Sequence, residues 1–308
     1  MGKHPTRRRL EQFGWSVGSR LAHLLGRRLS LRALQRVADA FACMVMAGGP
    51  RRQRLADANI AAAFPELSVA ERQRVRRRSV QNVARTMVEL FKLPYLSKEE
   101  VAALVVAPDS EPLRQALSAG GGVLMISAHY GNWELLGAYL SGQVAPVTVV
   151  ARDATDEVVA SLINEARASH GVRVVGRRDT RQMLRVLNAG GLLGVLPDQY
   201  PAEGGAFMEF LGRPTWVFTG PAVLASRTAC RVFPVFCVRD FNGPFRLEIL
   251  PEVELVHSED RQEDIVENTR RTSAVIEQMI RAHPDNWLWL HNRWKTSRRP
   301  APTGPDVS

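Results

Sequence analysis

The sequence has few cysteines and no long uncharged apolar segment. Its 308 residues include three cysteines, Cys43, Cys230 and Cys237, and none belong to a C-x-x-C pair. We therefore expect reduced thiols in an apolar core, as in a cytosolic protein, rather than disulfides. No stretch reaches the roughly 18–20 apolar residues that a membrane-spanning helix needs. Arginine pairs interrupt the apolar segments near the start, so we expect no cleavable signal peptide of ordinary form.

Acidic residues are scarce in one part of the chain. Residues 1–54 hold two acids, Glu11 and Asp39, against twelve lysines and arginines, and this difference equals the whole net charge of +10. The basic residues alternate with apolar ones, which predicts two basic amphipathic helices in an N-terminal arm, residues 1–50. Such an arm fits a polyanion, and we favour an anionic membrane surface over nucleic acid. The alternative is a helix pair packed on the main domain with solvated arginines.

The remaining chain predicts one α/β domain, residues 51–297, followed by a disordered tail, residues 298–308. Residues 51–105 have helical patterns, and Ser68 with Glu71 forms a capping box. Beyond residue 107, short apolar strands alternate with helices. We expect strands near 122–127, 146–151, 172–175, 192–196, 231–238 and 244–250, and helices near 111–119, 132–142, 155–169, 179–189, 217–229 and 261–282. This order predicts a mostly parallel central sheet flanked by helices.

The stretch GVLMISAHYGNWELLG, residues 122–137, places an imidazole and a carboxylate after a buried strand. Chemistry in parallel sheets collects at the carboxyl ends of strands, where His129 is expected. Asn132 is a good N-cap, which puts Glu134 in the first helical turn, where it can face His129. Such a pair can act as a general base. No activated protein nucleophile is evident. Ser127 does not lie in the strand–turn–helix motif, the nucleophile elbow, that exposes a catalytic serine, and the G-x-S-x-G at residues 14–18 follows no strand.

The string SAHYGNWELLG resembles the H-x4-D/E motif of the glycerolipid acyltransferase superfamily, in the version found in bacterial lipid A late acyltransferases. Further similar segments follow in the same order, over about residues 50–296: NIAAAFPELSVAERQRV, LLGVLPDQY, FLGRPTWVFTGPAVLA, VFPVF and HPDNWLWLHNRWK. One departure stands out: family members usually carry an apolar N-terminal anchor, whereas the equivalent region here is amphipathic and rich in arginine. The related mannoside acyltransferases usually have Asp where this chain has Glu134, so Glu134 and the HNRWK ending favour the lipid A branch.

The resemblance implies roles for individual residues. It makes His129 the general base and Glu134 its partner, and it marks Arg167 and Asp198 as functional. Positive charge would serve an oxyanion or the phosphates of a substrate, so we also name Arg152 and Arg213 as candidate phosphate ligands. The alternatives are a surface role for Arg167, a turn role for Asp198 and a loop-ending role for Arg213. We expect Trp287, Trp289 and Trp294 to pack the C-terminal segment onto the sheet.

The implied activity is transfer of a fatty acyl chain from an acyl carrier protein or coenzyme A thioester to a hydroxyl of a membrane glycolipid. The expected acceptor is a Kdo-bearing lipid A precursor at the cytoplasmic face of the bacterial inner membrane, with the enzyme peripheral or anchored by its N-terminus. We expect no metal or cofactor. The alternatives are another lipid acceptor, a phosphatidylinositol mannoside or a lysophospholipid; a hydrolase that uses water; or a basic binding protein with a structural histidine.

Overall fold

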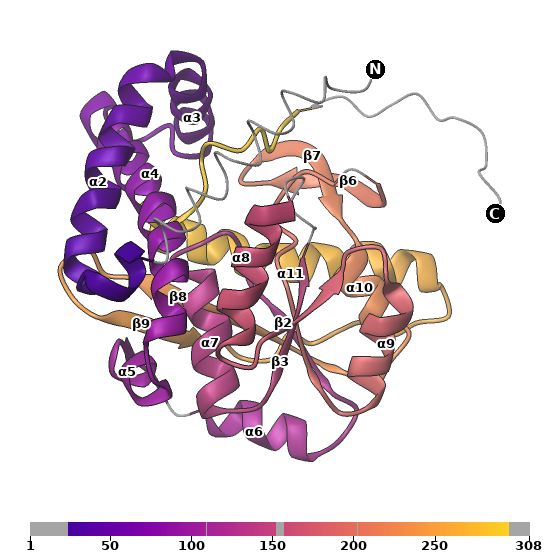
Figure 1. Ribbon diagram of the computed structural model, residues 1–308. Coiled ribbons are helices and arrows are strands. Elements are labelled where there is room, and N and C mark those ends of the chain that lie inside the picture. The colour runs from indigo at the N-terminus through magenta and orange to yellow at the C-terminus, as the bar shows by residue number, and fades with distance from the viewer. Residues whose placement is uncertain (1–23, 109, 152–156, 202, 296–308) are drawn as a thin grey trace, which may run out of the picture.

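The computed structural model describes residues 24–108, 110–151, 157–201 and 203–295. Arg152, the first 23 residues of the basic arm and the expected tail, residues 298–308, lie outside these ranges. The described residues form a central sheet with helices on both faces (Figure 1). The predicted α/β class is therefore confirmed.

The sheet has seven strands in the order β1-β9-β8-β2-β5-β3-β4. Neighbours pair in parallel except β8 and β9, which are antiparallel. Because β2 lies in the middle, both of its faces are covered: Leu124 and Ile126 join one hydrophobic cluster, and Val123 and Met125 the other. The strands are β1 (Val105–Val106), β2 (Val123–Ile126), β3 (Val147–Ala151), β4 (Arg173–Gly176), β5 (Leu192–Val195), β8 (Arg231–Arg239) and β9 (Phe245–Ile249).

The helices form a layer on each face of the sheet. The layer with α4 (Val69–Lys92) also contains α6 (Glu111–Ser118), α7 (Trp133–Gln143) and α8 (Glu157–Ala168). The opposite layer contains α9 (Thr180–Asn188), α10 (Gly220–Ala225) and α11 (Arg261–Ala282). The remaining elements are α2 (Leu31–Gly48), α3 (Pro50–Ala63), α5 (Lys98–Ala103) and the 3-10 turns η1 (Leu93–Tyr95) and η2 (Pro284–Asn286).

One segment differs from the sequence-based expectation. A two-stranded hairpin, β6 (Gly205–Phe210) and β7 (Arg213–Phe218), precedes α10, so the helix expected from residue 217 begins at Gly220. The hairpin turn is Leu211-Gly212, with φ of +51° and +74°. Two consecutive positive φ angles are typical of the two-residue turn that joins antiparallel strands, and Gly212 was the local signal for it.

The helix α2 packs against α4, so one of its faces is directed at the rest of the protein. Arg85 donates two hydrogen bonds to Asp39, at 2.8 and 2.6 Å, and Gln35 donates to Glu89 at 2.7 Å. Packing of this part of the arm on the main domain is thus observed, with exposed arginines beside it. Cys43 is exposed on this helix, which corrects the expectation that all three thiols are buried. None of the described helices has the length and apolarity needed to cross a bilayer.

The loop from β2 to α7 is fixed by its backbone. Gly131 has a φ of +54°, and a Cβ on it would overlap the carbonyl oxygen of Cys237. Its N–H donates to the carbonyl of Asn286 at 2.9 Å. Its own carbonyl accepts from Asn82 at 2.9 Å and from Thr86 at 3.1 Å. Only glycine combines this angle with such close backbone approach.

We expect Gly131→Ala to lower the free energy of unfolding by about 2–5 kcal/mol, because left-handed strain adds to a backbone overlap. Gly137→Ala is the matched control. Gly137 lies within α7, where a Cβ would meet Val172 at an ordinary 3.5 Å, so alanine there should be neutral or stabilising by up to about 1 kcal/mol. Urea denaturation measures both, and equal effects of the two substitutions would contradict the argument.

Candidate active site

The site lies at the carboxyl ends of the central strands β2 and β5. These strands pair in parallel with Ile126 opposite Val195. His129 and Asp198 each follow three residues later, so register alone brings them together. The imidazole Nδ1 of His129 lies 2.9 Å from Oδ1 of Asp198, and the backbone N–H of His129 donates to Oδ2 at 3.1 Å. Asp198 therefore fixes both the ring and the main chain of the histidine.

The carboxylate that contacts His129 is thus Asp198 and not Glu134. The expected cap is present, since the Asn132 side chain accepts from the N–H groups of Glu134 and Leu135. From that first turn, however, Glu134 points to Arg167 in the last turn of α8. Arg167 donates from Nε at 2.9 Å and from Nη2 at 2.7 Å, which is a bidentate ion pair. All four residues were candidates from the sequence, but the expected contact between His129 and Glu134 is absent from the structure. His129 pairs with Asp198, and Glu134 pairs with Arg167.

The surroundings of His129 adjust its basicity. Burial by itself lowers the pKa of His129, but the charge and hydrogen bond of Asp198, helped by the charge of Glu134, outweigh it and raise the pKa above its ordinary value. The pKa of Asp198 is lowered, because the same interactions overcome the effect of burial. The His129 side chain is 25% exposed and that of Asp198 is 1% exposed. Since Asp198 occupies Nδ1, Nε2 is the nitrogen available to a substrate.

Two C-terminal residues that motif analysis did not single out for this role support Asp198. Trp287 was expected only to pack, and it does so in a buried position, but its Nε1 also donates to Oδ2 of Asp198 at 2.9 Å. Arg293 is fully buried, and burial lowers its pKa to about 10. Its Nη1 donates to the carbonyl of Trp216 at 2.7 Å. The nearby positive charge favours the ionised form of Asp198.

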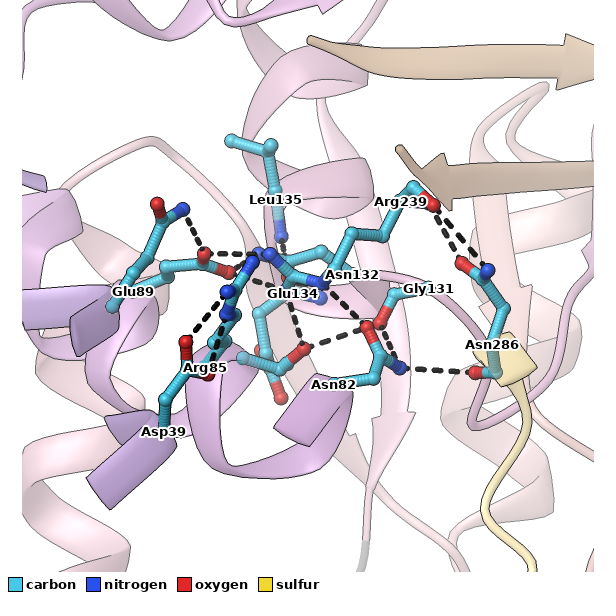
Figure 2. Close-up of polar contacts among 12 residues, drawn as sticks. Asp39, Asn82, Arg85, Glu89, Gly131, Asn132, Glu134, Leu135, Arg239 and Asn286 are labelled. Carbon is cyan, nitrogen blue, oxygen red and sulfur yellow. Dashed lines mark hydrogen bonds and ion pairs between the residues drawn. The ribbon is translucent and has the colours of Figure 1, made fainter. Parts of the chain in front are cut away.

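A buried polar network holds the loop that carries the site (Figure 2). Arg239, at the end of β8, donates to both oxygens of Glu89, at 2.7 and 2.6 Å, and both side chains are almost completely buried. Glu89 also accepts from the side chain of Asn132 at 2.7 Å, so the ion pair positions the N-cap of α7. Asn82 accepts from Arg239 and donates to Gly131. The network joins α4, the β2–α7 loop and β8.

The remaining candidates lie elsewhere or contribute no contact. Arg213 stacks over the ring of Trp294, 4.6 Å from its centroid, and no contact joins it to His129 among the described residues. Ser127 is buried, and its hydroxyl has no hydrogen-bond partner within the described part of the chain. In the described ranges, no three His, Cys, Asp or Glu side chains are placed to hold a metal ion.

Comparison with known proteins finds a matching family and similar enzymes. A family described as bacterial lipid A biosynthesis acyltransferase matches residues 1–296. The palmitoleoyltransferase of lipid A biosynthesis from Escherichia coli is 25% identical over 80% of this chain and 79% of its own length. The lauroyltransferase of lipid A biosynthesis from E. coli is 23% identical over 82% of both chains. A phosphatidylinositol mannoside acyltransferase from Mycolicibacterium smegmatis is 26% identical over 71% of both.

An α/β sheet with a histidine–carboxylate pair at its central strand ends, together with these matches, defines an acyltransferase. More specifically, the chain belongs to the bacterial lipid A biosynthesis acyltransferase family.

The pairing of His129 can be checked without substrate. NMR titration of the imidazole should give a His129 pKa above about 6.5, its ordinary value. Asp198→Asn should move this pKa down, because the main group that raises it loses its charge. Glu134→Gln should move it down less, because Glu134 acts only through space. A larger shift in Glu134→Gln than in Asp198→Asn would contradict the assignment.

Proposed function

We propose that the protein is an O-acyltransferase that moves a fatty acyl chain from a thioester to a hydroxyl of a membrane glycolipid, a Kdo-bearing lipid A precursor. The observation that carries the proposal is the His129–Asp198 pair in a chain of this family: Asp198 binds Nδ1, Nε2 has no hydrogen-bond partner among the described residues, and the imidazole is partly exposed. The donor is an acyl carrier protein or coenzyme A. The names of the E. coli relatives, both enzymes of lipid A biosynthesis, support the acceptor class.

In the proposed reaction, Nε2 of His129 removes the proton of the acceptor hydroxyl as its oxygen attacks the thioester carbonyl. Asp198 stabilises the imidazolium that forms. Collapse of the tetrahedral intermediate makes the ester bond and breaks the carbon–sulfur bond. The imidazolium then returns its proton to the leaving thiolate, so the products are an ester and a free thiol, and His129 is neutral again.

Glu134 and Arg167 serve as an oriented charge in this proposal. The bidentate pair uses Nε and Nη2 of Arg167, and the side chain is 17% exposed. Its Nη1 has no partner among the described residues and can donate to a phosphate of the donor or acceptor. Glu134 would thus be catalytic only indirectly, by holding this guanidinium and by raising the pKa of His129.

A different lipid acceptor is the second candidate. The mannoside acyltransferase from M. smegmatis is 26% identical over 71% of this chain, and the E. coli palmitoleoyltransferase is 25% identical over 80% of it. Glu134 at the end of the motif favours the lipid A acceptor. The same chemistry would serve a phosphatidylinositol mannoside or a lysophospholipid, so the activity assay must offer these acceptors in parallel.

We expect label from a radiolabelled dodecanoyl thioester, on acyl carrier protein or coenzyme A, to enter a Kdo-lipid A precursor in the presence of the wild-type protein. His129→Ala should lower this rate by about 10²–10⁴-fold or more, because the general base is lost. The control is His257→Ala, which removes an exposed histidine far from this chemistry in the sequence and should leave the rate unchanged. Transfer that survives in His129→Ala would contradict the mechanism, and free fatty acid formed without any acceptor would indicate a hydrolase.

We further propose that α2 contacts an anionic membrane, at the cytoplasmic face of the bacterial inner membrane. Val37, Phe41 and Met44 recur at helical spacing and are 49%, 54% and 63% exposed. Exposed arginines precede or accompany them, at positions 27, 28, 32 and 36. An apolar stripe beside basic side chains is typical of a helix that lies in the interface of a bilayer. The protein would then be peripheral, with its site near the lipid acceptor.

Phe41→Ser/Met44→Ser should reduce sedimentation with phosphatidylglycerol-containing vesicles several-fold, because two apolar contacts with the bilayer are lost. The matched control is Val69→Ser/Val266→Ser, which removes two exposed apolar side chains from α4 and α11. Binding should also weaken with added salt, since exposed charges are screened. Equal vesicle binding by the two double variants would contradict this surface.

A further inference from the structure

A second imidazole lies at the edge of the site and has no role in the mechanism above. His291 is half-buried in the C-terminal segment that follows Trp287. That segment is attached to the catalytic loop, because the N–H of Leu288 donates to the carbonyl of His129 at 3.1 Å. The ring of His291 is itself fixed, since the backbone N–H of Tyr200 donates to its Nε2 at 3.2 Å.

Both histidines are therefore held by one short segment. Asp198 binds the His129 ring through its side chain, and Tyr200 binds the His291 ring through its backbone. Two residue steps of extended chain span at most about 7 Å. The two imidazoles are thus attached to positions of the chain that lie only two residues apart. Consistent with this, the charges of Asp198 and His129 both act on His291.

The hydrogen bond from Tyr200 also determines where His291 carries its proton. Because Nε2 accepts a hydrogen bond, the neutral ring has its proton on Nδ1. Burial, with the charges of His129 and Arg293, lowers the pKa of His291 and favours this neutral ring. Nδ1 has no partner in the described part of the chain and does not belong to its buried unpaired atoms. It is therefore an open hydrogen-bond donor.

We propose that His291 is a catalytic residue that donates a hydrogen bond from Nδ1–H to the thioester carbonyl oxygen as that oxygen becomes negative. The inference rests on the proposed acyl transfer. His291 gives up no proton: it stabilises the oxyanion, while His129 carries out the proton transfers. A neutral donor suits this position, because a cation would repel the His129 imidazolium that forms in the same step.

Other donors near the site are less available for this role. Two nitrogens of Arg167 are used by Glu134, and its Nη1 is the donor proposed above for a phosphate. The unpaired nitrogens of Arg293, Nε and Nη2, are buried and cannot reach an entering group without rearrangement. Nδ1 of His291 is both oriented and open, which is what a preorganised oxyanion donor requires.

Two near-isosteric substitutions distinguish a catalytic role of His291 from a purely structural one, in which the ring serves only to accept the hydrogen bond from Tyr200. His291→Asn keeps an N–H donor near the position of Nδ1 but cannot accept from Tyr200. His291→Gln keeps an acceptor near the position of Nε2 but loses the Nδ1 donor. Acyl transfer is measured with dodecanoyl thioesters of acyl carrier protein and of coenzyme A, on the Kdo-lipid A precursor. Thermal unfolding of each variant is recorded alongside.

We expect His291→Gln to lower kcat by about 10²–10³-fold with little change in KM, since a donor acting in the transition state is lost. His291→Asn should retain kcat within about tenfold. A purely structural role would give the reverse order of kcat values, with the Gln variant active and the Asn variant impaired, and would overturn the proposal. Equal loss in both variants would overturn it as well.

A measurement on the unaltered protein provides an independent check. Nitrogen-15 NMR of the wild-type ring should show a neutral His291 with its proton on Nδ1 at pH 6.5, and a proton on Nε2 would overturn the proposal. The assay also separates the two levels of inference. Wild-type transfer that His129→Ala abolishes and His291→Gln leaves intact removes only the role of His291, whereas no wild-type transfer to any acceptor removes both.

Discussion

The arrangement of the site depends on one buried carboxylate. Asp198 accepts from the ring of His129, from the backbone N–H of His129 and from the indole of Trp287. An ionised carboxylate with a side chain 1% exposed would be costly without partners. Three hydrogen bonds to a charged acceptor, each worth about 1.5–3 kcal/mol, offset that cost. The same contacts align the β2–α7 loop, β5 and the C-terminal segment around one group.

A second buried pair maintains the position of the loop itself. Arg239 and Glu89 are almost fully buried and are joined by two hydrogen bonds, one to each carboxylate oxygen. Removing either side chain would leave an uncompensated buried charge and lower the free energy of unfolding by about 3–5 kcal/mol. Glu89 also holds Asn132, whose side chain caps α7. The network therefore connects α4 to the N-terminus of α7, the helix that carries Glu134. Stability and site geometry share these contacts.

Much of the fold followed from local pattern, whereas the pairing within the site did not. The apolar run of β2, the Asn132 cap and the bounds of α11 could all be predicted, because each depends on neighbouring residues. The choice of Asp198 over Glu134 as the partner of His129 could not. It depends on the parallel register of β2 and β5, strands that are far apart in the sequence. The hairpin β6–β7 was missed for a different reason: its signal is one turn, Leu211-Gly212.

The motif spacing can now be understood as backbone geometry. Four residues separate His129 from Glu134, and they contain the tight turn at Gly131 and the cap at Asn132. This spacing places Glu134 in the first turn of α7, opposite Arg167 at the end of α8, while His129 remains at the strand end beside Asp198. The motif therefore does not form one pair: His129 pairs with Asp198 and Glu134 pairs with Arg167, and the two pairs share a loop. Each half of the motif binds a partner that lies outside it, which is why sequence proximity alone suggested the wrong contact.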